Sequence, residues 1–210
     1  MNKKLSIIIV TYNSINLIKD CIDSIFNYSN IPEEKLEIIV VDNSDVKASN
    51  ELFDFVRKEY GERIILIKNK ANLGYGQGNN VGINAATGDV ICIMNPDVRF
   101  TEPLLKIVQN DFELDPKLCL LGFKQMGGQN TSFYLKPECN YGIFTSISIK
   151  MVNRLNLFYK SKFHLSGAFM FLDKAKFIEI GKFDENIFMY YEEADISNRI
   201  EKRGYHIKYS

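Results

Sequence analysis

Residues 5–13 read LSIIIVTYN, and this stretch decides the fold class. A nearly continuous apolar run from Leu5 to Val10 leads straight into polar residues. Strands that are buried on both faces of a parallel sheet have this β-branched, non-alternating pattern. Three similar runs follow in the first half of the chain: Leu36–Val41, Ile64–Ile67 and Val90–Met94.

Helical patterns lie between these expected strands. Apolar residues fall on one face at helical spacing from Ile15 to Phe26, with Ser14 as a candidate N-cap. A shorter stripe covers Leu52 to Tyr60, and a third helix is expected over Val81 to Ala86, after a glycine-rich turn. Strand and helix alternate, so the predicted fold class is α/β, with a mostly parallel sheet flanked by helices.

The second half of the chain is less regular. Residues 127–157 show no clear period and are expected to be partly loop. Helices are expected over Pro103–Asp111, Lys174–Ile180 and Glu192–Lys202, and strands over Leu118–Phe123, Leu165–Leu172 and Tyr205–Tyr209.

Charge and cysteine usage exclude several function classes. Lysine and arginine number 26, as do aspartate and glutamate, and this balance argues against a nucleic-acid partner. Four cysteines lack Cys-x-x-Cys spacing, and Cys21, Cys92 and Cys119 lie in apolar runs, so we expect buried free thiols in a reducing compartment. The two histidines, His164 and His206, have no neighbours at zinc-ligand spacing.

The sequence shows neither a signal-peptide pattern nor a membrane-spanning stretch. The apolar run from Leu5 is too short for a signal peptide, and no stretch approaches the ~20 apolar residues that span a bilayer. We therefore expect a cytoplasmic protein, with peripheral association at the inner face of the cell membrane left open.

Polar residues follow each of the four strands expected in the first half. In open parallel sheets, ligands bind beyond the carboxyl ends of the strands. Any strand must end in a polar turn, which accounts for one or two such clusters, but four at one edge favour a binding site. The clusters are Thr11-Tyr12-Asn13, Asp42-Asn43-Ser44, Asn69 with Asn72, and Asn95-Pro96-Asp97.

Two carboxylates at this edge have alternative interpretations. Asp42 could accept hydrogen bonds from a base or a ribose hydroxyl, or it could cap a turn. Asp97 could bind a hard divalent cation that neutralises a diphosphate leaving group, or it could cap a helix after Thr101.

Two further segments are candidates on weaker grounds. Glycines from Gly74 to Gly78 would allow close backbone approach to a ligand, but they lack the spacing of the dinucleotide fingerprint and of the P-loop. Residues 190–195 read YYEEAD, in which aromatics beside carboxylates favour a general base. Acidic residues are also common in the first turn of a helix.

Taken together, these segments resemble the family-2 glycosyltransferases, which have the GT-A type nucleotide-binding fold. The resemblance covers almost the whole chain. Within the family, the chain looks most like the rhamnosyltransferase-like branch of bacterial surface polysaccharide synthesis. The segments that carry it, in order, are Ser6–Asn13, Val40–Ser44, Asn72–Ile83, Met94–Val98, Ser166–Ala168, Gly181–Glu185 and Phe188–Asp195.

The resemblance implies an inverting glycosyltransferase. It would move a sugar from a dTDP- or UDP-sugar donor to a saccharide or lipid-linked acceptor. Residues 1–210 would form one GT-A domain, with residues 1–98 as the nucleotide-binding half and residues 99–210 as the acceptor and catalytic half.

The resemblance also assigns a donor site and a metal. Many members have arginine where Asn79 stands. Asp97 matches the last acid of the metal-binding Asp-x-Asp motif, whose first acid is replaced by Asn95, and implies Mg²⁺ or Mn²⁺. The residues matched to nucleotide-sugar binding are Thr11, Tyr12, Asn13, Asp42, Asn43, Asn72, Gly74, Asn79 and Asn95.

The implied catalytic residues lie near the end of the chain. Glu193 matches the general base of the Glu-Asp motif, although most members have aspartate there. Glutamate is one methylene longer, so either the distance is adjusted or Glu192 is the base. Asp195 and Arg199 match positions that order the base and its helix.

Two small residues and the chain end complete the implied site. Gly167 and Ala168 would leave room for the acceptor. Many members continue past the last strand and supply a metal-binding histidine, whereas this chain ends at Ser210 and His206 lies inside the expected strand. We expect a short variant or a C-terminally truncated chain, with a weakened metal site in either case.

Three other functions are alternatives to an active glycosyltransferase. Glu193 and the short C-terminus favour a catalytically weak or inactive nucleotide-sugar-binding paralogue. A nucleotidyltransferase would need a basic, glycine-rich loop after the first strand, where residues 11–14 read TYNS. A dehydrogenase would need the dinucleotide fingerprint at that same place.

Overall fold

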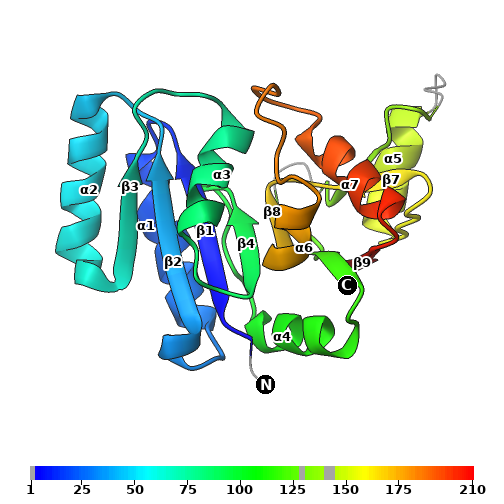
Figure 1. Ribbon diagram of the computed structural model, residues 1–210, viewed down its shortest axis with the longest axis horizontal. Coiled ribbons are helices and arrows are strands. Elements are labelled where there is room, and N and C mark those ends of the chain that lie inside the picture. The colour runs from blue at the N-terminus through cyan, green and yellow to red at the C-terminus, as the bar shows by residue number, and fades with distance from the viewer. Residues whose placement is uncertain (1–2, 128–130, 140–144) are drawn as a thin grey trace.

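A seven-stranded sheet runs through the computed structural model, which describes residues 3–127, 131–139 and 145–210 (Figure 1). The strand order is β3-β2-β1-β4-β8-β5-β9, and β6 and β7 form a separate pair. The strands are β1 (Leu5–Thr11), β2 (Leu36–Asp42), β3 (Ile64–Lys68), β4 (Val90–Met94), β5 (Leu118–Gly122), β6 (Phe133–Leu135), β7 (Phe163–Leu165), β8 (Phe169–Asp173) and β9 (His206–Tyr209).

Helices follow most of the strands, as the alternating pattern predicts. They are α1 (Ile15–Tyr28), α2 (Val46–Tyr60), α3 (Tyr75–Ala85), α4 (Leu105–Leu114), α5 (Thr145–Arg154), α6 (Lys174–Glu179) and α7 (Glu192–Lys202). Short 3₁₀ turns at Glu33–Lys35 and Gly61–Arg63 lead into β2 and β3.

The four strands expected from the first half pair in parallel, which confirms the α/β fold class. β1 lies between β2 and β4, and β3 pairs with β2. β8 is antiparallel to both β4 and β5, while β9 is parallel to β5. Thr11 lies opposite Asp42, and Asp42 opposite Lys68, so β1, β2 and β3 end level with one another.

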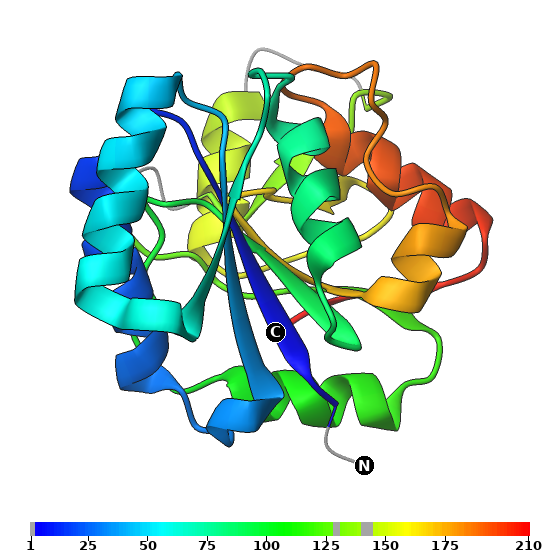
Figure 2. The ribbon, with the colours of Figure 1, turned by 60° about the vertical axis from the view of Figure 1, so that its left-hand side comes forward.

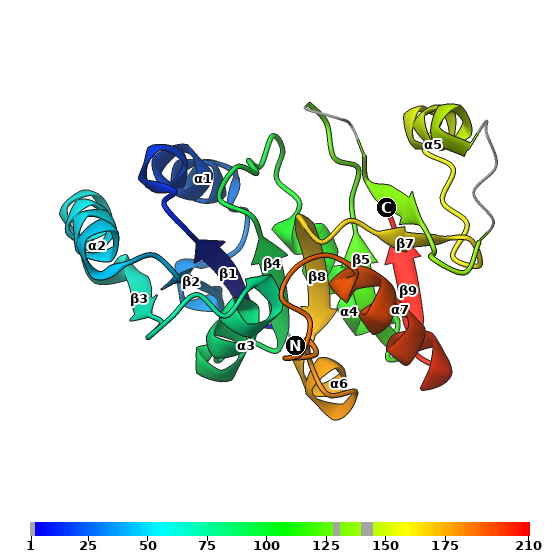
Figure 3. The same cartoon turned by 90° about the horizontal axis from the view of Figure 1, so that it is seen from above.

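Helices cover both faces of the sheet, which explains why its central strands are apolar throughout (Figure 3). Ile7 and Ile9 of β1 face a core built with α1, α2 and α4. Ile8, on the other face, packs in a core with α3, α6 and α7. Each fully buried isoleucine side chain contributes roughly 1.5–3 kcal/mol to folding.

The third helix begins earlier than the sequence predicts. It starts at Tyr75, so the glycine-rich segment expected to be a turn is largely helical. Glycine weakens a helix by about 1 kcal/mol relative to alanine, but here it permits close packing. A Cβ on Gly78 would lie 2.9 Å from Val10 Cγ1, and one on Gly82 would meet Ile8.

The strand expected over Leu165–Leu172 is broken into two. β7 ends at Leu165 and pairs with β6, whereas β8 begins at Phe169 and joins the main sheet. Ser166, Gly167 and Ala168 carry the chain between the two sheets. An apolar run cannot reveal this break, because both pieces are buried.

Several smaller expectations are settled. Ser14 stands at the N-cap of α1 but forms no capping bond, because its hydroxyl donates to Tyr12 O at 2.9 Å. The region over residues 127–157 contains β6 and α5, while residues 128–130 and 140–144 lie outside the described part. Cys21, Cys92 and Cys119 are buried free thiols, as expected.

His206 is a surface residue of β9, and its Nδ1 lies 2.7 Å from Asp115 Oδ2. Within the described residues, no helix is long and apolar enough to cross a membrane.

Candidate functional site

The strand-edge cluster, which we define as Thr11, Asp42, Ser44 and Ser49, lies where β1 and β2 end. Asp42 is fully buried, and its Oδ1 accepts hydrogen bonds from Thr11 Oγ1 at 2.7 Å and Ser44 Oγ at 2.9 Å. Its Oδ2 accepts from Ser44 N at 3.2 Å and from Ser49 Oγ. A carboxylate offers about four acceptor sites, so this one is saturated from within the chain.

Asp42 therefore organises the edge of the sheet in this structure. The capping role that the sequence left open is present, because Asp42 fixes the turn through Ser44 and the first turn of α2 through Ser49. Direct contact of Asp42 with a nucleoside stays a prediction, and any such contact would have to replace one of these bonds.

Asparagines form a second layer beside this cluster. Asn43 Nδ2 donates to Gly74 O at 3.2 Å and to Asn72 Oδ1 at 3.4 Å, while Asn69 Nδ2 donates to Asn43 Oδ1 at 2.6 Å. The network joins the ends of β2 and β3 to the start of α3. Its outer member, Asn72, is exposed and available to a ligand.

Tyr12 and Asn13 are also exposed at this edge. Asn13 adopts a left-handed backbone (φ 52°), which asparagine tolerates better than most residues, and its N–H donates to Ser44 Oγ at 2.8 Å. A small hollow of about 210 Å³ lies here, lined by Asn13, Ser44, the start of α1 and the first two turns of α2. The predicted donor residues thus divide into exposed ones and buried supporting ones.

Asn79 belongs to the buried group. It lies inside α3, fully shielded from solvent, and its Nδ2 donates to Tyr75 O at 3.0 Å. Its Oδ1 has no hydrogen-bond partner among the described residues.

The glycines at the start of α3 contact protein rather than open space. A Cβ on Gly74 would overlap the backbone carbonyl of Phe188, and Gly74 itself has a positive φ of 95°. The Tyr75 N–H donates to Phe188 O at 3.0 Å. The space that a Cβ would take at Gly74 and Gly78 is thus filled by the chain itself, and contact of these glycines with a ligand stays a prediction.

A second group of residues, which we name the Glu193 corner, consists of Tyr75, Gly167, Glu192 and Glu193. The Gly167 N–H donates to Glu193 Oε1 at 3.0 Å, and the Tyr75 hydroxyl donates to Gly167 O at 2.7 Å. The first turn of α3, the β7–β8 connection and the first turn of α7 thus meet at one residue, Gly167. Figure 2 shows α3 and the connection that precedes α7 side by side.

Gly167 packs directly against Glu193, and its contact with an acceptor stays a prediction. A Cβ at this position would lie 2.7 Å from Glu193 Cγ, so the space that glycine leaves free is occupied by the glutamate side chain. Glycine here lets the longer glutamate lie against the backbone, which accounts for the extra methylene. Ala168 is partly buried beside it.

The two adjacent glutamates differ in environment. Glu192 is 3% exposed, and its Oε1 has no hydrogen-bond partner in the described part of the chain. Burial raises the pKa of Glu192, and the charge of Glu193 raises it further. Glu193 is half-buried, and its Oε1 is held by Gly167.

Tyr75 was not singled out from the sequence, although it stands inside a quoted motif. Burial, and after it the charges of Glu193 and Glu192, raise the pKa of Tyr75 well above its usual range, so its hydroxyl stays a donor. A tyrosine within a glycine-rich segment is the only sequence signal, and nothing local reveals its distant partner Gly167.

Asp195 is tied to the other side of α7. Arg199 donates to its Oδ2 through Nε at 3.0 Å and through Nη2 at 2.6 Å. Arg199 Nη1 also donates to Ile180 O at the end of α6, at 2.6 Å. These contacts fix α7 in place, in line with the ordering role that the resemblance implies.

Asn95 and Asp97 lie at the end of β4, which connects the two groups. The Asn95 N–H donates to Ala168 O at 2.9 Å, so this end of β4 adjoins the Glu193 corner. Asp97 is exposed, and no described residue donates a hydrogen bond to it. It does not cap α4, which begins at Leu105 with Leu104 at its N-cap.

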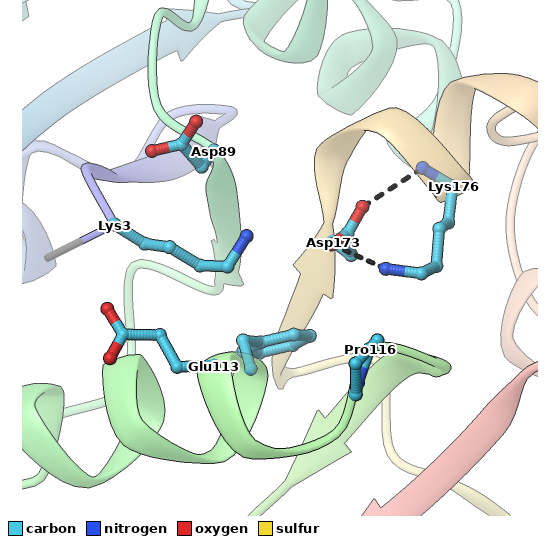
Figure 4. A pocket seen from close by; sticks show the side chains of 7 residues that line it. Lys3, Asp89, Glu113, Pro116, Asp173 and Lys176 are labelled. Carbon is cyan, nitrogen blue, oxygen red and sulfur yellow. Dashed lines mark hydrogen bonds and ion pairs between the residues drawn. The ribbon is translucent and has the colours of Figure 1, made fainter. Parts of the chain in front are cut away.

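A larger hollow of about 580 Å³ lies at the opposite edge, where β1 and β4 begin and β8 ends (Figure 4). Its charged lining includes Lys3, Asp89 and an ion pair between Lys176 and Asp173 at 2.7 Å. None of the residues predicted to bind or react lines it. Its size therefore does not mark the candidate site.

Comparison with known proteins identifies the class first. The fold is shared with a mannosyltransferase from Pyrobaculum calidifontis, solved with GDP-Man and Mn²⁺. The TM-score is 0.72 at 17% identity, over 100% of this chain and 55% of that one. The architecture is that of GT-A glycosyltransferases.

The family follows from the sequence. The model of glycosyl transferase family 2 matches residues 6–181, and the chain belongs to this family. A poly(ribitol-phosphate) beta-glucosyltransferase of Bacillus spizizenii is 36% identical, over 65% of this chain and 22% of its own length. A glycosyltransferase of Methanocaldococcus jannaschii is 30% identical, over 89% of this chain and 61% of its own length. The chain thus spans less than two thirds of each relative.

Proposed function

We propose that this chain carries the transferase site of an inverting glycosyltransferase, which moves a sugar from a nucleoside-diphosphate donor to a hydroxyl of a saccharide or lipid-linked acceptor. The observation that carries the proposal is the Glu193 corner, where a half-buried carboxylate adjoins the end of β4 through the Asn95–Ala168 bond. Residues 1–98 would bind the nucleotide, and residues 99–210 the acceptor.

Glu193 is the proposed base. Its Oε1 is held by the Gly167 N–H at 3.0 Å, and no described residue donates to Oε2. Oε2 would take the proton of the acceptor hydroxyl as that oxygen bonds to the anomeric carbon. The bond between that carbon and the diphosphate breaks on the opposite face, and the nucleoside diphosphate leaves.

Glu192 is less suited to this role, although the sequence alone leaves it open. Its side chain is almost completely buried, so an acceptor hydroxyl could reach it less easily than it could reach the half-buried Glu193. The Tyr75 hydroxyl would hold the Gly167 carbonyl, and Gly167 in turn would fix the position of Glu193 through its N–H.

The nucleoside would lie over the exposed residues of the strand edge. Tyr12, Asn13 and Asn72 offer an aromatic ring and amide groups to solvent there, while Asp42 and Asn43 support them from below. The donors proposed from the resemblance are dTDP- and UDP-sugars. The polymer named for the Bacillus relative supports a role in surface polysaccharide synthesis.

A divalent cation fits Asp97. The described residues form no group of three or more histidine, cysteine, aspartate or glutamate side chains able to hold a metal. Mg²⁺ is commonly bound by one or two carboxylates together with substrate phosphates, and an exposed, unpartnered Asp97 suits that mode. Such an ion would neutralise the diphosphate leaving group.

The test is a thermal-shift screen of UDP, dTDP and GDP sugars with Mn²⁺, followed by calorimetry. We expect one nucleotide class to raise the melting temperature and bind in a divalent-dependent way, and Asp97→Ala to abolish that dependence. Asp20→Ala, which removes a similarly exposed aspartate on α1, is the control. Equal binding with and without Mn²⁺ would remove the metal from the proposal, and no binding of any nucleotide would remove the donor.

A further inference from the structure

Residues 188–191 form the aromatic ridge, a row of exposed large side chains directly before the candidate base. Phe188, Met189, Tyr190 and Tyr191 are 55%, 50%, 73% and 68% exposed. Figure 1 shows this connection between α6 and α7 (orange) above the end of the sheet, beside the start of α3. Contiguous apolar surface of this kind commonly marks a binding site.

The backbone of the ridge is strained. Tyr190 and Tyr191 have φ values of 70° and 72°, a left-handed conformation that bulky residues rarely adopt. Tyr191 is the N-cap of α7, where glycine or asparagine would make the same turn with less strain. The two exposed rings bring no burial that offsets this strain, so packing does not explain the choice of tyrosine.

The hydroxyls of both tyrosines are available. No described residue forms a hydrogen bond with either of them. The ridge is nevertheless firmly placed, because Phe188 O accepts the Tyr75 N–H at 3.0 Å and Tyr191 O accepts the Asp195 N–H at 3.0 Å. An anchored backbone thus carries two free amphipathic rings within three residues of Glu193.

Charge decides between two kinds of occupant. Residues 183–198 contain five acidic side chains and no lysine or arginine. Membrane-binding segments gain affinity from basic residues near anionic lipid headgroups, and this composition opposes such binding. A neutral sugar ring meets no such repulsion, and it offers an apolar face for the rings and hydroxyls for hydrogen bonds.

We propose that Tyr190 and Tyr191 form a stacking platform for the pyranose ring of a neutral saccharide acceptor, beside Glu193. This inference rests on the proposed function and narrows the acceptor to a sugar ring rather than a lipid headgroup. The platform would hold the acceptor hydroxyl near Glu193, so that the tyrosines set acceptor specificity while leaving donor binding unchanged.

The test follows the tyrosine rings by NMR in the full chain. Spectra of Tyr190→Phe and Tyr191→Phe assign the two rings among the eleven tyrosines. Methyl glycosides of glucose, galactose and N-acetylglucosamine are then added, with and without UDP, dTDP or GDP and Mn²⁺. We expect the resonances of Tyr190 and Tyr191 to shift with at least one glycoside, and those of Tyr28, at the far end of α1, to stay unchanged.

Glycine substitutions separate the platform from a structural role. Tyr190→Gly and Tyr191→Gly remove the ring and relieve the left-handed backbone, so the melting temperature should hold or rise. Glycoside affinity should fall roughly three- to tenfold for each ring. A purely structural role would show the opposite pattern, with a lower melting temperature and unchanged affinity.

Two outcomes would overturn the platform. One is the absence of any ring shift with all three glycosides. The other is ring shifts with vesicles of phosphatidylglycerol and phosphatidylethanolamine but with no glycoside, which would make the ridge a membrane contact. Failure of the proposed function has a separate readout, because it appears as absent nucleotide binding in the thermal-shift screen.

Discussion

The strand-edge cluster and the Glu193 corner both centre on a carboxylate near the carboxyl ends of strands. They differ in how many hydrogen bonds that carboxylate accepts from the chain. Asp42 accepts four hydrogen bonds from the chain and has no exposed surface. Glu193 accepts one, and the neighbouring Glu192 has an oxygen with no partner in the described residues. A saturated carboxylate stabilises the fold, whereas one with spare acceptor capacity can react with a substrate.

The contrast extends to the backbone. Of the five described non-glycine residues with positive φ, only Asn13 lies in the first half of the chain, and Tyr190 and Tyr191 stand beside the Glu193 corner. Four of the five residues with buried polar atoms that lack a partner, among those described, also lie after residue 98. Near the Glu193 corner these are the backbones of Tyr190 and Tyr191 and the side chains of Glu192 and Ser197, whereas Gln109 and Asp111 lie on α4.

The largest effect should come from Asp42→Ala. It would leave the buried hydroxyls of Thr11 and Ser49 with only long contacts to backbone carbonyls, at 3.4 and 3.5 Å, and we expect a loss of about 3–5 kcal/mol in the free energy of unfolding. Urea-induced unfolding measures this loss. Asp45→Ala, which removes only the N-cap of α2, should lose about 1 kcal/mol. Equal losses in the two variants would show that the saturated network does not stabilise the edge.

Gly167→Ala should break the Glu193 corner instead. The added Cβ would lie 2.7 Å from Glu193 Cγ and would displace the carboxylate. With the donor identified in the thermal-shift screen, we expect the rate of nucleoside diphosphate release to fall about 100-fold. Gly88→Ala crowds Ser6 Oγ at 2.6 Å at the opposite edge, so it should affect stability and leave turnover intact. Equal turnover losses in both variants would indicate general damage.

Tyr75→Phe should have a smaller effect on the same corner. It removes the hydroxyl that donates to Gly167 O and leaves the ring in place. We expect roughly a tenfold loss of turnover and about 1 kcal/mol of stability. Tyr60→Phe removes a comparable hydroxyl that donates to Asp23 at 2.8 Å, far from the site, and should spare turnover. Unchanged turnover in Tyr75→Phe would mean that Glu193 needs no such support.

The smallest effect concerns pH. The pKa of Glu192 is raised in the folded chain, so the protonated side chain favours folding. This stabilisation is fully present below the ordinary pKa of 4.5 and is lost as pH rises through the pKa of the folded state. Glu192→Gln should therefore be more stable than the parent at neutral pH and equal to it below pH 4.5.

Glu179→Gln provides a control of opposite sign. Hydrogen bonds from Tyr205 and Arg203 lower the pKa of Glu179, so this contribution is present above pH 4.5 and is lost as pH falls through the folded value. Its removal should destabilise the chain at neutral pH. Thermal unfolding across the pH range measures both variants, and the same sign in both would show that the two environments do not differ as described.

The sequence predicts the first half of the fold well, because its physics is local. Runs such as Leu36–Val41 need burial on both faces, and the polar residues that follow them must gather where parallel strands end. Even here α3 departs from expectation. Glycine signals a turn locally, and only the packing of Gly82 against Ile8 shows why a helix tolerates it.

The second half depends on contacts between distant segments. The break between β7 and β8, the bond from Tyr75 to Gly167 and the place of Glu193 against Gly167 all join residues more than twenty positions apart. A motif can indicate that Glu193 is a base, as the family resemblance does. It cannot show that the free space of Gly167 is taken by that glutamate, because this follows only from packing.

The most direct test of Glu193 as the base is the comparison of donor binding and turnover in Glu193→Gln. The variant keeps the size of the side chain and a carbonyl oxygen that can accept the Gly167 N–H, but it cannot take a proton. We expect the nucleotide affinity measured by calorimetry to match that of the parent. The rate at which nucleoside diphosphate is released when the sugar is transferred to an acceptor should fall by about 100-fold or more. Full turnover in Glu193→Gln would contradict the assignment and place the base elsewhere.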